Sequence, residues 1–217
     1  MKLITEYTQN QLSYSIEEAK NGKKNTFLEG VFMQADIKNR NGRVYPKEIM
    51  EKEVNRYNKE FVEKQRAFGE LGHPEGPTIN LDKVSHLIQT LTLEGSNYVG
   101  KAKILSTPNG EIVKALINDG AKLGVSSRGL GSLEQKGNAQ YVKGDFQLAT
   151  AGDIVADPSA PEAFVEGIME GVEWIMGTNG VLTAIQAEDF QRTLKSTRLN
   201  KLEETKLNLW KRFVESL

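Results

Sequence analysis

Two short segments of the chain contain residue types that a hydrolytic reaction needs. The first is 124–132, GVSSRGLGS, in which Ser126 and Ser127 are adjacent and are followed by an arginine. The second is 69–77, GELGHPEGP, in which His73 lies where glycine and proline disfavour both a long helix and a central strand. A histidine on such a rigid loop is a candidate general base, and a serine is a candidate nucleophile.

Several functions compete for the serine segment. No Gly-Lys-Ser/Thr follows at the spacing of a phosphate-binding loop, and Arg128 occupies the position where a Gly-x-Ser-x-Gly nucleophile elbow requires glycine. A serine-protease turn fits, since small residues let a substrate carbonyl approach Ser126 and backbone N–H groups near Arg128 and Gly129 can face an oxyanion. A glycine-rich surface loop remains the alternative.

Histidine and cysteine usage limits the other chemistries. The chain has 2 histidines and no cysteine, which excludes a three-histidine metal site, thiolate zinc sites, disulfides and cysteine nucleophiles. His86 falls in a predicted strand, where a satisfied structural histidine is the usual finding. We therefore predict neither a metal nor a cofactor.

The composition is that of a folded, water-soluble protein. The 217 residues are 38% hydrophobic and 26% charged. Because 28 basic residues stand against 29 acidic ones, no overall positive field is available for nucleic acid or an anionic membrane. The polar start, 1–24, does not resemble a signal peptide, and no apolar run approaches the length of a membrane span, so we expect a cytoplasmic protein.

The residue pattern predicts a mixture of strands and helices with antiparallel pairing. A loosely held arm is expected before the first strand, and the Ile49, Met50, Val54, Tyr57 and Phe61 stripe predicts a core-facing helix that begins at Pro46. A charged, helical tail with an apolar stripe is expected from residue 184. The predicted strands are 27–37, 84–93, 98–105, 139–143 and 146–156, and a second helix is predicted over 111–123.

Four segments together resemble a known family. They are 29–32 (EGVF), 39–46 (NRNGRVYP), 69–74 (GELGHP) and 124–133 (GVSSRGLGSL). In this order they resemble the prohead core proteases of T-even-like phages, which are related to the assemblin-type proteases of herpesviruses. The resemblance runs over about 27–165 and implies an α+β fold, a small, mainly antiparallel β-barrel flanked by helices. It divides the chain into an N-terminal arm (1–26), a serine protease domain (27–172) and a helical C-terminal tail (173–217).

The resemblance also implies a catalytic site. The motif positions map the catalytic pair onto His73 and Ser126, and the oxyanion hole onto the backbone of Ser127, Arg128 and Gly129. Asp153 is the expected third member, which orients the imidazole, and Glu70 is a local alternative. Assemblins use a second histidine, but it follows the serine, whereas His86 precedes it, so that role is not carried to His86.

Substrates and location also follow from the resemblance. It implies an endopeptidase that cleaves scaffold, core and major capsid proteins inside the assembling prohead in the host cytoplasm, after glutamate in Leu/Ile-x-Glu sites. Homo-oligomers, a zymogen and self-cleavage are expected, with no nucleic-acid or membrane partner. The pattern occurs within this chain at 4–6, 16–18, 49–51, 168–170 and 202–204. The alternatives are a non-catalytic capsid-core or scaffold component and a serine hydrolase of small esters.

Overall fold

Antiparallel sheets dominate the fold, with few helices. The computed structural model describes residues 2–8, 12–18, 24–39, 41–74, 76–156, 172–176 and 182–186. Two five-stranded sheets and a small three-stranded sheet are formed, and nearly all strand pairs are antiparallel. The expected α+β class with antiparallel pairing is confirmed.

The first large sheet has strand β8 in its interior. Its order is β11-β8-β1-β12-β13, so β8 pairs with β11 on one edge and with β1 on the other. The strands span Lys2–Thr8 (β1), Gly124–Gly131 (β8), Gln147–Val155 (β11), Val172–Met176 (β12) and Leu182–Gln186 (β13). All residues of β8 are buried.

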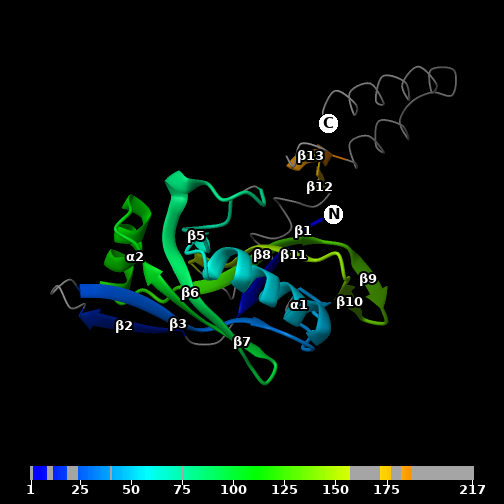
Figure 1. The fold of residues 1–217 in the computed structure, drawn as a ribbon, viewed down its shortest axis with the longest axis horizontal. Coiled ribbons are helices and arrows are strands. Elements are labelled where there is room, and N and C mark those ends of the chain that lie inside the picture. The colour runs from blue at the N-terminus through cyan, green and yellow to red at the C-terminus, as the bar shows by residue number, and fades with distance from the viewer. Residues whose placement is uncertain are drawn as a thin grey trace, which may run out of the picture.

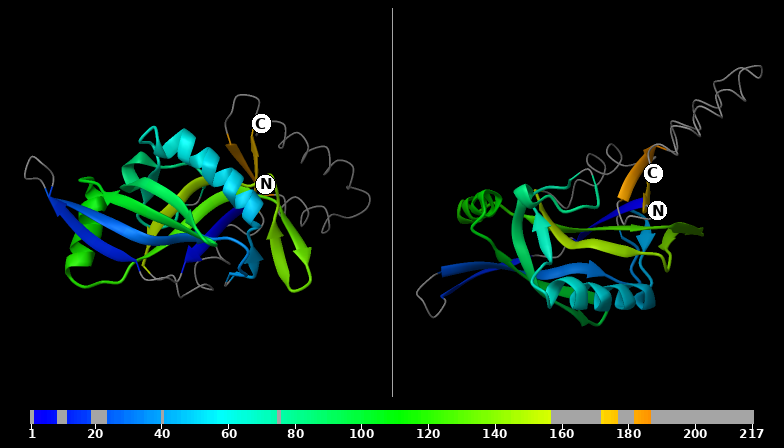
Figure 2. Two further views of the ribbon diagram at one scale, coloured as in Figure 1. Left: turned by 60° about the horizontal axis from the view of Figure 1, so that its bottom comes forward. Right: turned by 45° about the horizontal axis from the view of Figure 1, so that its top comes forward.

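The second large sheet packs against the first. Its order is β2-β3-β7-β6-β5, and β7 alternates strictly between partly buried and buried residues, as expected for a strand with one face on the core. The strands span Ser13–Glu18 (β2), Lys24–Gln34 (β3), Phe68–Glu70 (β5), Val84–Glu94 (β6) and Asn97–Ile104 (β7). Figure 2 shows the two sheets as facing layers, and Phe32 of β3 lies close to Gly152 of β11 between them.

The two sheets meet at one corner through β5 and β11. Leu71 forms a single parallel bridge with Ile154, and the N–H of Gly72 donates to the Ile154 carbonyl at 2.7 Å. The third sheet is β4 (Arg43–Val44), β10 (Ala139–Val142) and β9 (Leu133–Lys136). A β-barrel was expected, but the described strands form these three separate sheets, and at the corner between β5 and β11 a single bridge takes the place of a continuous ladder.

The helices confirm the predicted core stripe. Helix α1 (Lys47–Tyr57) continues into a π-helical turn, η1 (Asn58–Val62), and Met50, Val54 and Tyr57 are buried in the core. Helix α2 (Pro108–Asn118) begins three residues before the predicted start, because the Thr107 hydroxyl caps it and Pro108 suits its first turn. A short 3-10 turn, η2 (Leu81–Lys83), precedes β6. Figure 1 shows α2 and the β9–β10 hairpin at opposite ends of the molecule.

The N-terminal arm expected over residues 1–26 contains two regular strands among its described residues. Strand β1 is paired along its whole length with β8, and β2 is paired with β3. The sequence interpretation failed because the pairing partner of β1 lies more than a hundred residues away, so no local pattern reports it. The domain boundaries at 27 and 172 stay a prediction.

Little of the expected helical tail falls within the described residues. Strands β12 and β13 form a hairpin, so the helical pattern does not start at residue 184 as expected. The rest of that prediction, residues 187–217, lies outside the described residues. No helix among the described residues is long and apolar enough to cross a membrane.

Candidate active site

Ser126 lies in the middle of buried strand β8, not on the loop or turn that the sequence suggested. Both edges of β8 are paired, so its backbone polar groups find partners without solvent. Glycine permits this packing, since a Cβ on Gly129 would lie 2.7 Å from the Gln147 carbonyl oxygen and from the Phe146 ring. The Ser126 side chain is fully buried, and its hydroxyl has no hydrogen-bond partner among the described residues.

Strand β11 places Asp153 directly opposite Ser126. Directly paired residues on antiparallel strands have their side chains on the same face, so Asp153 and Ser126 share a face of the sheet. Arg128 shares it too, because it lies two residues from Ser126. The register between β8 and β11 shifts twice around Thr150, and such bulges re-aim neighbouring side chains.

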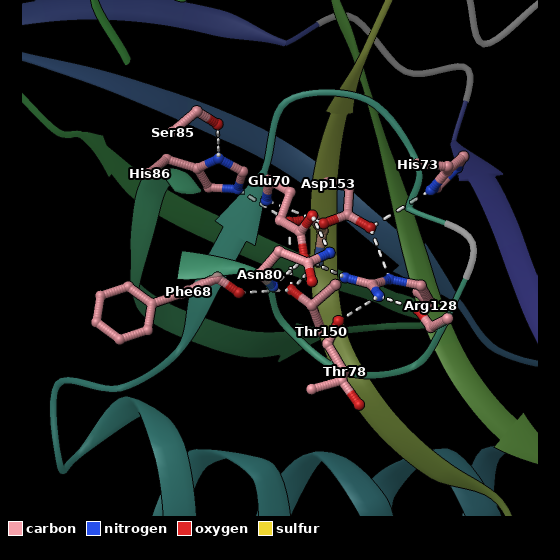
Figure 3. Close-up of polar contacts among 12 residues, drawn as sticks. Phe68, Glu70, His73, Thr78, Asn80, Ser85, His86, Arg128, Thr150 and Asp153 are labelled. Carbon is pink, nitrogen blue, oxygen red and sulfur yellow. Dashed lines mark hydrogen bonds and ion pairs between the residues drawn. The ribbon is translucent and has the colours of Figure 1, made fainter. Parts of the chain in front are cut away.

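His73 reaches the same aspartate from the loop that follows β5. Gly72 directly before it has a φ of 82°, which favours glycine, and its N–H is bonded to β11. This fixes the loop, and His73 Nδ1 lies 3.3 Å from Asp153 Oδ2. The His73 side chain is 13% exposed. Asp153 therefore joins the histidine loop to the serine strand, as Figure 3 shows for the His73 contact.

Arg128 ties two buried carboxylates together. Its Nε donates to Asp153 Oδ2 at 3.0 Å and its Nη2 to Glu70 Oε1 at 3.2 Å, and all three side chains are fully buried. Asp153 Oδ1 also accepts the Glu70 backbone N–H at 3.0 Å, and Glu70 accepts the N–H of Asn80 at 2.9 Å. Figure 3 shows the guanidinium between the two acids.

The charges in this network are not balanced by Arg128 alone. Two carboxylates face one guanidinium, so the ionised network holds one negative charge in excess beside His73. A buried excess charge is costly unless it has a counter-charge. Any positive charge that develops on the imidazole during a reaction would therefore lie beside the Asp153 carboxylate.

Comparisons with known proteins identify the family of this chain. A family model described as "Prohead core protein serine protease" matches residues 10–173. The chain belongs to this family. It is 38% identical over 146 residues, 66% of this chain and 69% of the relative, to the prohead core protein protease of Enterobacteria phage T4. The solved structure of the bacteriophage T4 capsid assembly protease superposes with a TM-score of 0.69 at 31% identity, covering 72% of this chain and 98% of that one.

The structure distinguishes the two acids that the sequence offered as the third catalytic residue. The Asp153 carboxylate contacts His73. The Glu70 carboxylate contacts Arg128 and Asn80 instead, and only the Glu70 backbone N–H meets Asp153. Glu70 is therefore part of the same network, but its carboxylate contacts Arg128 and not His73.

The segment expected to form an oxyanion hole has a second feature that the sequence analysis missed. The backbone of Ser127, Arg128 and Gly129 lies inside the paired region of β8. The Arg128 side chain was given no role, yet it is the largest fully buried side chain among the described residues. The available signal was an arginine in a run of small residues, where a buried position demands acidic partners.

His86 occupies the structural position that the sequence predicted. It is fully buried in β6, with Nδ1 2.9 Å from Ser85 Oγ and Nε2 2.9 Å from the Gly152 carbonyl oxygen. Because a carbonyl oxygen only accepts, Nε2 carries the proton and the neutral ring is satisfied at both nitrogens. Burial lowers the pKa of His86, and the nearby negative charge of Asp153 opposes that shift in part.

Gly69 explains why the histidine motif begins with glycine. A Cβ at this position would lie 2.1 Å from His86 Nε2 and 2.3 Å from the Gly152 carbonyl oxygen. Such distances are shorter than any real contact of a Cβ, so only glycine lets β5 approach β11 here. The motif therefore carries a packing requirement as well as the candidate base.

Proposed function

We propose that this chain is a serine endopeptidase of prohead maturation, with Ser126 as nucleophile, His73 as general base and Asp153 orienting the imidazole. The observation that carries the proposal is the position of Asp153, opposite Ser126 in the β-ladder and in contact with His73 Nδ1. Membership of the prohead core protease family supports it.

In the proposed reaction, Ser126 Oγ attacks the carbonyl carbon of the scissile peptide while its proton passes to His73. The carbon–nitrogen bond breaks, the leaving amine takes the proton from His73, and an acyl-enzyme remains. Water then hydrolyses the ester by the same proton route. Asp153 holds the ring in one tautomer, and the excess negative charge of the network stabilises the imidazolium that forms in each step.

The proposed oxyanion donors are backbone N–H groups of Ser127, Arg128 and Gly129. They lie on the nucleophile strand within three residues of Ser126. Arg128 would also act through its side chain, as a positioning residue that holds Asp153.

The proposed substrates are scaffold, core and capsid proteins inside the assembling prohead, cleaved after glutamate in Leu/Ile-x-Glu sites. The names of the T4 relatives support the setting, since they are a prohead core protease and a capsid assembly protease. Self-association and trimming of the chain's own termini belong to the same proposal. Light scattering and the masses of the incubated chain would test those two points.

The experiment compares the wild-type chain with Ser126→Ala and Ser127→Ala on a core protein that carries Leu-x-Glu sites. Wild type and Ser127→Ala should give fragments ending in glutamate, because Ser127 lies on the opposite face of β8 and the alanine keeps its backbone N–H. Ser126→Ala should give none, with its unfolding free energy unchanged or about 1 kcal/mol higher. Equal cleavage by all three chains would refute the nucleophile. A wild type inactive even in assembled proheads would favour a scaffold component.

A further inference from the structure

The edge of β8 that faces away from β11 is held by the chain's own first strand. All seven residues of β1 are in register with β8, from Lys2 opposite Gly131 to Thr8 opposite Val125. Among the described residues, β1 pairs with β12 at one position, Lys2 opposite Glu173, so its pairing in this sheet is mainly with β8. Without β1, the strand that carries Ser126 would present an open edge.

The register of β1 aligns a cleavage pattern with the nucleophile. Residues 4–6, Ile-Thr-Glu, match the Leu/Ile-x-Glu pattern, and the bond after the glutamate joins Glu6 to Tyr7. Glu6 lies opposite Ser127 and Tyr7 lies opposite Ser126. The Glu6–Tyr7 peptide bond, which is the bond that a protease of this specificity would cut, therefore lies opposite Ser126 and Ser127.

We propose that this edge of β8 is the substrate-binding site, which takes an extended Leu/Ile-x-Glu segment by antiparallel strand addition, and that β1 is a cis-acting stand-in for that segment. The inference rests on the proposed protease function. Strand addition supplies main-chain hydrogen bonds for affinity, while side-chain positions supply specificity. A substrate in the register of β1 presents the bond after its glutamate to Ser126.

Two further observations favour an exchangeable strand over a permanent one. The family model matches from residue 10, so β1 lies outside the region that this chain shares with it. In addition, β1 engages the backbone N–H groups on this edge of β8 with which a substrate strand in the same register would pair. Departure of β1 frees both the binding edge and these donors.

The test weakens β1 in the full-length chain with the double substitution Thr5→Pro and Glu6→Pro. Neighbouring residues of a strand direct their N–H groups to opposite edges, so one of the two prolines removes a donor to β8. The matched control, Ser15→Pro with Ile16→Pro, weakens β2, which lies at the edge of the other sheet and pairs with β3. The substrate is a separate Leu-x-Glu peptide with a fluorescent reporter.

We expect kcat/KM for this peptide to rise about tenfold in the β1 variant and to stay unchanged in the β2 control. The loss of one backbone hydrogen bond raises the population of chains in which β1 is detached from β8 by about tenfold. Unchanged or lower turnover in a folded β1 variant overturns the inference. A β1 variant that fails to fold by circular dichroism overturns it as well, since an exchangeable strand is dispensable for folding.

A binding measurement separates this inference from the protease function itself. A labelled peptide with the sequence of residues 2–8 is titrated against Ser126→Ala chains with and without the β1 substitutions, so that no cleavage is needed. Binding at least about tenfold tighter to the chain with weakened β1 supports the site. Equal binding to both chains refutes it, even where both fold and wild type is an active protease. If the peptide binds as expected but no chain cleaves anything, the protease proposal fails and the binding edge stands.

Discussion

Substituting each buried acid in turn distinguishes a catalytic aspartate from a structural one. Asp153→Asn and Glu70→Gln both remove one of the two carboxylates that face Arg128 and leave the guanidinium with a single counter-charge. The two variants are matched in charge and in burial. The difference that matters for the imidazole is that only Asp153 contacts His73.

The magnitude follows from the geometry of that contact. Two unit charges 3.3 Å apart attract by about 5 kcal/mol at an effective dielectric constant of about 20. Losing this attraction when His73 becomes an imidazolium corresponds to a fall of about 10³–10⁴ in kcat. Glu70→Gln keeps the Asp153 contact, so its kcat should stay within about tenfold of wild type. Arg128 keeps one charged partner in each variant, so each should lose about 1–3 kcal/mol of stability from one weakened buried hydrogen bond.

The assay measures kcat on a Leu-x-Glu peptide and the unfolding free energy in urea for the same preparations, so that rates are compared per folded molecule. A large loss of kcat in Asp153→Asn beside a nearly active Glu70→Gln, at similar stability, supports the assignment. The reverse order of activities would make Glu70 the orienting acid. Equal losses in both would mean that the network acts as a whole, and the specific role of Asp153 would be refuted.

Two further predictions concern the packing around the site. Gly69→Ala should lower the unfolding free energy by about 1–3 kcal/mol, because the new Cβ would collide with His86 and the Gly152 carbonyl. In the control Gly144→Ala, the new Cβ meets nothing within 4 Å, so its unfolding free energy in urea should lie within about 0.5 kcal/mol of wild type. Equal effects of the two substitutions would refute the packing argument. The lowered pKa of His86 means that the unfolded chain binds a proton at this residue more readily than the folded chain does. The folded state therefore keeps its full stability above about pH 6.5 and loses up to about 1.4 kcal/mol per pH unit below it. The unfolding free energy should differ less between pH 7.5 and pH 5.5 in His86→Gln than in wild type, and an equal difference in both chains would contradict the prediction.

The sequence predicted the parts of the molecule that local patterns control. The stripe of α1 has helical spacing, and its members are buried or packed against the core as expected. The strands β6 and β7 and the turn between them follow from alternating residues around Gly95, which has a φ of 66°. The histidine loop was predicted because glycine and proline around His73 restrict the backbone directly.

The parts that the sequence did not reveal depend on distant partners. Segment 124–131 contains three glycines and reads as a loop, yet it is a strand because β1 and β11 pair with both its edges. The same non-local pairing made β1 look like an unstructured arm. The contacts of Arg128 with Glu70 and Asp153 bring together residues far apart in the sequence, and no spacing rule reports the direction of a buried guanidinium.

Strand β8 packs well, but it places the Ser126 hydroxyl in an unfavourable environment. Glycines let β8 pack tightly between its neighbours, but the buried Ser126 hydroxyl has no hydrogen-bond partner among the described residues. An unsatisfied buried hydroxyl costs about 1–3 kcal/mol, and alanine would fill the same space without that cost. Stability alone therefore favours alanine at position 126. Residues that break a local rule in this way are expected where function requires them, so the cost at Ser126 is itself an argument that its hydroxyl reacts.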